Sequence, residues 1–359
     1  MNLQTHLFIL GVLLLALIVA PPYNDKIINY TRCSNKLDNI TKEIFNKNKI
    51  NRVNFSDNWK LFIPCTYTSA EKELIKLKKL SCDKIIYAIT GMDNLIRKNS
   101  LWFYFEKKYG RHISKKYLPN TYILKDKNHM RIFENNYRSD NMYILKKNIQ
   151  RKKGLKLTYD LNEILLAKNK KYVVVQDYIR DIYLINNRKV NLRAYLLVTC
   201  HKGVTKFYFS QLGKCIYANK DYKEKSNHIE SHITSLNLNL DIYKKNPLTF
   251  LELKKFIGSR KYNILFKKML DIISKIKEVF SGIICKNSKF DNNLSFQLFG
   301  LDFIFNKQFV PLLLELNKGP QMIYYNKKDF EMKQELIHEV LNIAGVHTNS
   351  NNTNNFLLV

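Results

Sequence analysis

Two strongly apolar segments near the C-terminus constrain the fold of this chain more than any other feature. Residues 301–305 read LDFIF, residues 312–316 read LLLEL, and the polar pair Asn306-Lys307 begins the link between them. Short runs of large apolar residues bounded by polar links predict β-strands. The sequence therefore predicts two adjacent strands joined in a hairpin.

Three polar side chains interrupt these strands. Asp302 lies on the first strand, and Glu315 and Asn317 lie on the second. Alternate residues of a strand share a face, so Glu315 and Asn317 point the same way, and a hairpin can bring Asp302 opposite them. Two carboxylates and an amide oxygen suit Mg²⁺ that bridges nucleotide phosphates. The alternative is a solvated polar sheet face, although charges inside apolar strands are costly unless they are paired or bound to a metal.

Further patterns indicate an α+β fold with antiparallel strands near the C-terminus. Runs of β-branched and aromatic residues predict strands at residues 172–175, 194–199 and 206–210. Apolar residues recur at helical spacing from Met269 to Ile283 and over residues 336–341, which predicts two amphipathic helices. Residues 71–80 predict a short basic helix, and residues 23–70 show no firm periodicity. The Asn-rich residues 346–359 are expected to be a disordered tail.

An apolar segment at the N-terminus leaves three alternatives open. Residues 7–20 are continuously apolar and are followed by Pro21 and Pro22. Their length fits the hydrophobic region of a signal peptide, but no Lys or Arg precedes them. Residues 3–22 could instead form a membrane anchor with the rest of the chain in the cytosol, because basic residues follow the segment. The third alternative is a buried helix.

The charge of the chain predicts an anionic partner. It contains 60 Lys and Arg against 30 Asp and Glu, and the net charge of +30 creates a strong positive field. An AT-rich codon bias is the alternative explanation of the many lysines. A hydrophobic content of 45% excludes a wholly disordered chain. Six scattered cysteines without a C-x-x-C pair predict buried thiols instead of a zinc cluster or a dense disulfide framework.

Five segments, in order along the chain, resemble the motifs of one protein family. Residues 97–101 (RKNSL) are similar to R-K-x-x-L, and residues 143–146 (YILK) to W-I-V-K. Residues 176–179 (QDYI) and 188–195 (RKVNLRAY) are similar to Q-x-Y-I and R-K-F-D-x-R-x-Y, residues 232–235 (HITS) to H-L-T-N, and residues 299–303 with 313–317 to FGxDF and LLExN. The stretch from Arg97 to Asn342 thus resembles the tubulin tyrosine ligase-like family.

The resemblance implies an ATP-grasp fold, with mixed and antiparallel sheets and flanking helices, and a division of the chain. The expected parts are a hydrophobic signal or anchor at residues 1–22, an N-terminal domain at 23–96, a central ATP-grasp domain at 97–178, a C-terminal ATP-grasp domain at 179–345, and the tail at 346–359.

The resemblance also implies roles for single residues. The residues expected to bind ATP are Lys98, Lys146, Lys153, Gln176, Asp177, Tyr178, Ile179, Lys189, Asn191 and Thr234, the lysines because an ammonium group is a mobile point charge for phosphate oxygens. Arg193 and Lys189 are the expected catalytic residues, and Asp302, Glu315 and Asn317 are the expected Mg²⁺ ligands. Without the motifs, Lys98 and Lys146 would be interpreted as surface residues.

The chain departs from the family pattern mainly on the side of the acceptor. Asn191 stands where the family has Asp, Ser235 where it has Asn, and Ile216 where it has the Arg of a G-x-x-R stretch. The family's Gly-rich phosphate loop is represented only by residues 149–154. These changes leave the ATP and Mg²⁺ side nearly complete and weaken the acceptor side.

The resemblance implies a ligase that uses ATP to add an amino acid, with glutamate favoured, to the acidic tail of tubulin or of a similar protein through an acyl-phosphate. Tyrosine ligation and a family member that binds ATP or microtubules without ligating are the alternatives. The expected partners are that protein and a free amino acid, without nucleic acid, because no nucleic-acid-binding motif accompanies the charge. The expected location is the cytoplasm and cytoskeleton, with a membrane anchor as the open alternative.

Overall fold

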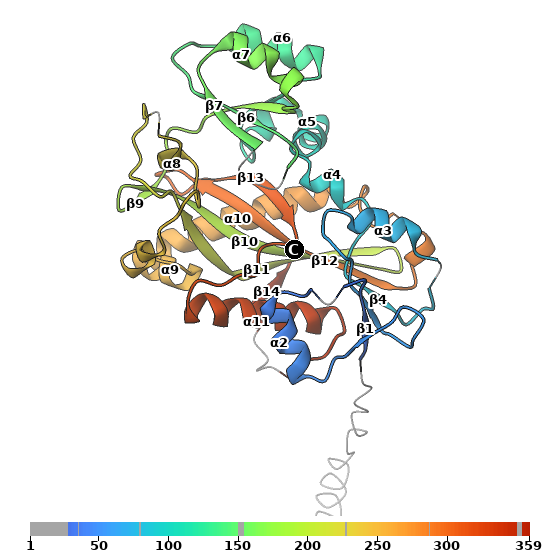
Figure 1. The fold of residues 1–359 in the computed structure, drawn as a ribbon. Helices are drawn as coiled ribbons and strands as arrows, with labels where there is room; N and C mark the ends of the chain where they lie inside the picture. The colour runs from blue at the N-terminus through green and yellow to red at the C-terminus, as the bar shows by residue number, and fades with distance from the viewer. Residues whose placement is uncertain are drawn as a thin grey trace, which may run out of the picture.

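The computed structural model describes residues 28–34, 36–78, 80–149, 154–226, 228–286, 288–349 and 354–359. The hydrophobic segment 1–22, with its expected signal or anchor role, and Lys153 lie outside these residues. Among the described residues, no helix combines the length and the apolar character that crossing a membrane requires. The described chain contains two β-sheets with helices around them (Figure 1), so the predicted mixture of sheets and flanking helices is confirmed.

The larger sheet has ten strands and joins distant parts of the sequence. Its long strands are antiparallel: β11 (Val204–Tyr217) pairs with β10 (Arg188–His201), β10 with β12 (Leu294–Phe305), and β12 with β13 (Pro311–Lys318), which confirms the predicted hairpin. Parallel pairing continues from β12 through β4 (Ile85–Ile86), β3 (Leu61–Phe62) and β1 (Tyr30–Thr31) to β2 (Arg52–Val53). β9 (Leu184–Ile185) pairs with the start of β10. The N-terminal strands therefore extend the C-terminal sheet instead of forming their own.

The smaller sheet has four antiparallel strands. Their order is β5 (Thr121–Ile123), β8 (Val174–Asp177), β6 (Tyr143–Lys146) and β7 (Leu155–Thr158). The helices α6 (Lys127–Asn136) and α7 (Leu161–Leu166) lie with this sheet at the top of Figure 1, and Phe133 and Ile164 are buried in its core. All these elements fall within residues 97–178, the range expected for the central domain; the domain boundaries themselves stay predictions.

Helices cover both faces of the larger sheet. The first face carries α3 (Ala70–Lys76), α4 (Met92–Ile96), α5 (Lys98–Ser114), α9 (Phe250–Ile257) and α10 (Ser259–Phe280), and the second carries α2 (Asn39–Lys47) and α11 (Lys327–Ile343). Short elements complete the described chain: α8 (Ile229–His232), η3 (Ala167–Lys170), η4 (Leu240–Lys244) and η5 (Ser288–Phe290). The predicted helices around residues 269–283 and 336–341 are thus confirmed, and the basic helix is confirmed as α3.

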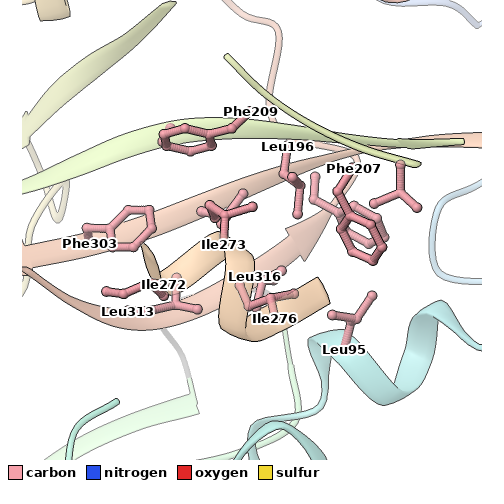
Figure 2. Close-up of a cluster of buried hydrophobic side chains, with 14 of the residues drawn as sticks. Leu95, Leu196, Phe207, Phe209, Ile272, Ile273, Ile276, Phe303, Leu313 and Leu316 are labelled. Carbon is pink, nitrogen blue, oxygen red and sulfur yellow. The ribbon is translucent and has the colours of Figure 1, made fainter. Parts of the chain in front are cut away.

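The alternation of side chains along β10 separates two apolar cores. Leu196 is buried in the first core with Ile272 of α10 and Phe303 of β12 (Figure 2). Its neighbour Leu197 is buried in the second core with Leu336 of α11. Because successive residues of a strand point to opposite faces, one apolar strand supplies both cores, and helices must cover it on each side.

The prediction that residues 346–359 form a disordered tail is wrong at its end. β14 (Phe356–Leu358) pairs with β11, with Leu358 opposite Tyr208. Phe356 is 5% exposed and belongs to the second core. Three apolar residues suffice here because the edge of β11 offers unpaired backbone groups and an adjacent apolar surface.

The prediction that the cysteines are ordinary buried thiols is also wrong for five of the six, because four form disulfides and Cys82 is exposed. Cys33 is bonded to Cys65, and Cys200 is bonded to Cys285, whereas Cys82 and Cys215 are free. The partners are 32 and 85 residues apart in the sequence. Pairs this distant in sequence carry no local spacing signal, so the fold alone brings them together.

We expect Phe356→Ala to lower the free energy of unfolding by about 3 kcal/mol, because it removes a buried aromatic side chain and leaves a cavity. Leu358→Ala is the matched control, since Leu358 is on the same strand but 64% exposed, and its effect should stay within about 0.5 kcal/mol. Urea denaturation of both variants measures the difference. Equal, small effects would show that β14 does not contribute to the core.

Candidate active site

A cavity of about 590 Å³ lies where the two sheets meet. Residues of β6 and β8 line it from the smaller sheet, and residues of β10, β12 and β13 line it from the larger one. All predicted site residues within the described part of the chain line this cavity: Lys98, Lys146, Gln176, Asp177, Tyr178, Ile179, Lys189, Asn191, Arg193, Thr234, Asp302, Glu315 and Asn317. Segments more than 200 residues apart in sequence thus converge on one space, while the role of each residue stays a prediction.

Four charged residues form a line across the strands of the larger sheet beside this cavity. Lys214 of β11 lies opposite Arg193 of β10, Arg193 opposite Asp302 of β12, and Asp302 opposite Glu315 of β13. We call Lys214, Arg193, Asp302 and Glu315 the charged row. The row places two cations side by side and then two anions side by side.

Arg193 and Lys98 neutralise the two anions of the charged row. Arg193 Nε lies 2.5 Å from Asp302 Oδ1 and its Nη2 lies 3.0 Å from Oδ2, which is a bidentate pair. Lys98 Nζ, at the start of α5, lies 3.2 Å from Glu315 Oε2. Gly300 leaves space for this arrangement, because a Cβ there would lie 3.1 Å from Arg193 Cδ and 2.9 Å from Pro320 Cβ.

The environment separates the pKa values of the two carboxyl groups. Burial raises the pKa of Asp302, although Arg193 opposes this rise. Burial also acts to raise the pKa of Glu315, but Lys98 and Lys146 outweigh it and lower the pKa to about 2. Glu315 is therefore ionised at neutral pH, as a metal ligand must be.

The donor atoms at this end of the cavity fit Mg²⁺. Asp302 and Glu315 are cross-strand partners, and Asn317 Nδ2 donates to Glu315 Oε1 over 3.1 Å, so the three side chains lie together. Oxygen ligands of this kind are those that Mg²⁺ prefers. The described residues contain no group of three or more His, Cys, Asp or Glu side chains that could hold a metal. A metal here would therefore depend on the amide oxygen of Asn317 and on oxygens from a ligand.

The cavity is also lined by two lysines whose pKa values are unusually low. Burial lowers the pKa of Lys146 to about 8, and burial together with the charge of Lys146 lowers the pKa of Lys189 to about 7. Lys189 Nζ donates to Tyr178 Oη over 3.2 Å, and Tyr178 Oη lies 2.8 Å from His232 Nδ1. An anionic ligand would favour the charged form of both lysines.

Two acceptor atoms of cavity residues have no hydrogen-bond partner within the described chain. Gln176 donates to Thr121 and Asn191 donates to Thr234, but the buried Oε1 of Gln176 and Oδ1 of Asn191 accept from no group. Buried polar atoms of native proteins almost always have a partner. These two acceptors therefore suit donor groups of a ligand.

Several other residues of this region were not among the predicted site residues. Ile144 and Ile304 line the cavity as apolar walls, and each lies two residues from a predicted site residue on the same strand, so strand alternation could have indicated them. Lys318 forms an ion pair with Asp93, and Lys214 forms one with Asp329. No pattern in the sequence indicates these long-range pairs.

A comparison with family models identifies the chain. The model described as the tubulin-tyrosine ligase family matches residues 75–354, which is most of the chain and contains every predicted site residue. The chain belongs to this family. The family that the short motifs resemble is thus confirmed over residues 75–354.

The relatives of this chain include proteins that are named for the addition of different amino acids to tubulin. Tubulin glycylase 3F of Tetrahymena thermophila is 29% identical over 210 residues, 53% of this chain and 23% of the relative. The probable tubulin polyglutamylase ttll-9 of Caenorhabditis elegans is 24% identical over 249 residues, 64% of this chain and 58% of the relative. Tubulin monoglutamylase TTLL4 of Mus musculus is 27% identical over 197 residues, 48% of this chain and 16% of the relative. The chain therefore spans less than two thirds of the length of each.

Proposed function

We propose that this chain is an ATP-grasp ligase that joins an amino acid, with glutamate favoured, to the acidic C-terminal tail of tubulin or a similar protein. The observation that carries the proposal is the convergence of all described site residues on one cavity in a chain of this family. Relatives named as polyglutamylases and a monoglutamylase favour glutamate, and glycylases among them make glycine the next candidate.

The residues that line the cavity suggest a separate role for each group of them. Residues 176–179, at the end of β8 and just after it, would hold adenine by its edge. Lys98, Lys146 and Lys189 would contact the phosphates, with Asn191 and Thr234 beside them. Asp302, Glu315 and Asn317 would hold Mg²⁺, which when bound neutralises the charge on the phosphates. Arg193 lies next to these ligands and would orient the carboxylate that ATP phosphorylates, before the amine of the second substrate attacks the acyl-phosphate.

The charge of the chain supports an acidic partner. A net charge of +30 accelerates encounters with a Glu-rich tail, and the acceleration falls as the salt concentration rises.

The names of the relatives refer to tubulin, which favours a cytoplasmic, cytoskeletal location. The two disulfides oppose that location, because such bonds are rare in the reducing cytosol. Alkylation of thiols in freshly lysed cells, followed by mass spectrometry, decides whether Cys33–Cys65 and Cys200–Cys285 form in the cell.

Incubation of the purified protein with tubulin, ATP, Mg²⁺ and one labelled amino acid at a time tests the proposed function. We expect transfer of label from glutamate, and a mass increase of one residue at the tail. Label from tyrosine alone would identify a tyrosine ligase. A protein that binds ATP but transfers no amino acid would be a non-catalytic family member. Asn191 and Ile216, which stand where the family pattern has Asp and Arg, would then explain the loss of activity.

We expect the binding of ATP to take up protons near pH 8. Lys189 has a pKa of about 7 in the free protein, so it is mostly neutral at that pH, and nearby phosphates favour its charged form. The affinity should therefore fall as the pH rises from 7 to 9, by up to about tenfold per pH unit for each proton taken up. Calorimetry in two buffers of different ionisation enthalpy measures the uptake. Lys189→Met should reduce it, and an unchanged uptake in this variant would contradict the role of Lys189.

A further inference from the structure

The charged row contains a junction that the proposed function leaves unexplained. Arg193 and Lys214 are directly opposite each other on β10 and β11, and directly opposed residues of paired strands have Cβ atoms about 4.5–5.5 Å apart. Like charges in such positions destabilise a sheet. The junction of the anions Asp302 and Glu315 attracts a cation, and by the same argument the junction of Arg193 and Lys214 attracts an anion.

The groups around this junction leave one positive charge in excess. Arg193 is paired with Asp302, whereas Lys214 Nζ and Lys333 Nζ lie 3.0 and 3.1 Å from the same oxygen, Asp329 Oδ2. Lys214, Asp329 and Lys333 are 5%, 0% and 1% exposed, so water can do little to stabilise the excess positive charge. Burial and the charge of Lys333 lower the pKa of Lys214 to about 8, although Asp329 opposes them. An excess buried charge is costly unless another counter-ion arrives.

A general abundance of lysine does not explain Lys214. Surplus lysines of a basic chain lie in water, but this side chain is buried, on the strand position opposite Arg193, which lines the cavity. Lys214 also stands two residues before Ile216, which lines the cavity. The two positions share a face of β11, and Lys214 is the one that lies opposite Arg193.

We propose that Arg193 and Lys214 form a binding site for a substrate carboxylate, next to the residues that would hold Mg²⁺. This inference rests on the proposed function, which supplies two carboxylates: that of the free amino acid and that of a glutamate in the acceptor tail. Both offer the same chemistry to the site.

The surroundings of the junction allow a ligand to enter from the cavity. Arg193 lines the cavity, as do Gly319, Pro320 and Gln321 at the start of the segment that joins β13 to α11. Tyr325 of the same segment covers Lys214, with its ring centre 4.1 Å from Nζ. A carboxylate therefore meets Arg193 first and Lys214 when Tyr325 turns aside. Neighbouring strands are about 4.8 Å apart, so Lys214 lies about 10 Å from Asp302, and a carboxylate and the phosphates fit side by side.

Binding of two probes to Lys214→Met tests the inference without requiring turnover. Calorimetry measures the affinity for glutamate and for a Glu-rich tail peptide, each with Mg²⁺ and a non-hydrolysable ATP analogue present. We expect the variant to bind one of them at least about tenfold more weakly than the wild type, and the affected probe identifies the source of the carboxylate. Lys328→Met is the matched control, because Lys328 pairs with Glu252 on the surface, and it should bind both probes like the wild type.

A second variant distinguishes a loss of the binding site from a general folding defect. Asp329→Asn removes the competing carboxylate and keeps an acceptor oxygen, so it should bind the same probe more tightly than the wild type, which a misfolded protein cannot do. Unchanged affinities of Lys214→Met for both probes, or a wild type that binds neither, would overturn the carboxylate site. A wild type that binds glutamate through Lys214 but never forms a peptide bond would instead contradict the proposed function and leave the site standing.

Discussion

Glu315→Gln should slow amino-acid ligation by about a thousandfold while the protein stays folded. The substitution keeps the volume of the side chain but removes the charge that would bind Mg²⁺, and metal ions contribute several kcal/mol to the stabilisation of charge in transition states of this kind. The amide oxygen of Gln can still accept a hydrogen bond from Lys98 Nζ, which lies 3.2 Å from Glu315 Oε2 in the wild type, so the protein should stay folded. Single-turnover ligation with labelled glutamate, at several Mg²⁺ concentrations, measures the loss.

The matched control is Glu278→Gln. Glu278 forms an ion pair with Lys275, 2.8 Å away, and its side chain is 41% exposed. Loss of such a surface pair changes stability by at most about 1 kcal/mol and should leave the ligation rate unchanged. A Glu315→Gln protein as active as this control would exclude Glu315 from the metal site.

Arg193→Ala should lower both stability and activity. It leaves Asp302 as a buried carboxylate without its bidentate partner, which typically costs about 3–5 kcal/mol of folding free energy. Catalytic efficiency should fall at least about tenfold, because a charge-assisted contact to substrate is lost. Urea denaturation and ligation assays on the same preparation measure the two effects.

A double variant separates the ion pair from other effects of Arg193. In Arg193→Ala with Asp302→Asn, residue 302 no longer carries a carboxylate without a partner, so the free energy of unfolding should exceed that of Arg193→Ala alone. Arg97→Ala is the surface control, because Arg97 lies 3.5 Å from Asp93 with a 54% exposed side chain, and it should cost at most about 1 kcal/mol. Equal stability of the single and double variants would show that the Asp302 carboxylate costs nothing when it lacks its partner.

The parts of the fold that the sequence predicts are those with local periodicity. The hairpin of β12 and β13 follows from two apolar runs and a short link, and α10 follows from apolar residues at helical spacing. β1, β2, β3 and β4 have two residues each, which is too short for any period to be visible. β14 depends on an edge of β11 that only the folded sheet creates.

The same limit applies to the candidate site. Asp302, Glu315 and Asn317 can be predicted to lie together because one hairpin carries them, and the other site residues because they fall within motifs of the family. Lys214 and Asp329 are 115 residues apart and belong to no shared motif, so only the fold reveals their pairing. The two disulfides could not be predicted from the sequence for the same reason.

The charged row also bears on how the strands of the larger sheet find their alignment. A shift of one residue between paired strands turns every side chain of one strand to the opposite face, so a slipped β10 would drive Arg193 into an apolar core. Irregularities in the ladder lie directly beside the row, between Ala194 and Leu196 on β10 and between Asp302 and Phe303 on β12, and such bulges fix the pairing locally. Misaligned sheets would bury several charges without partners. The residues of the charged row therefore also disfavour wrongly paired strands while the chain folds.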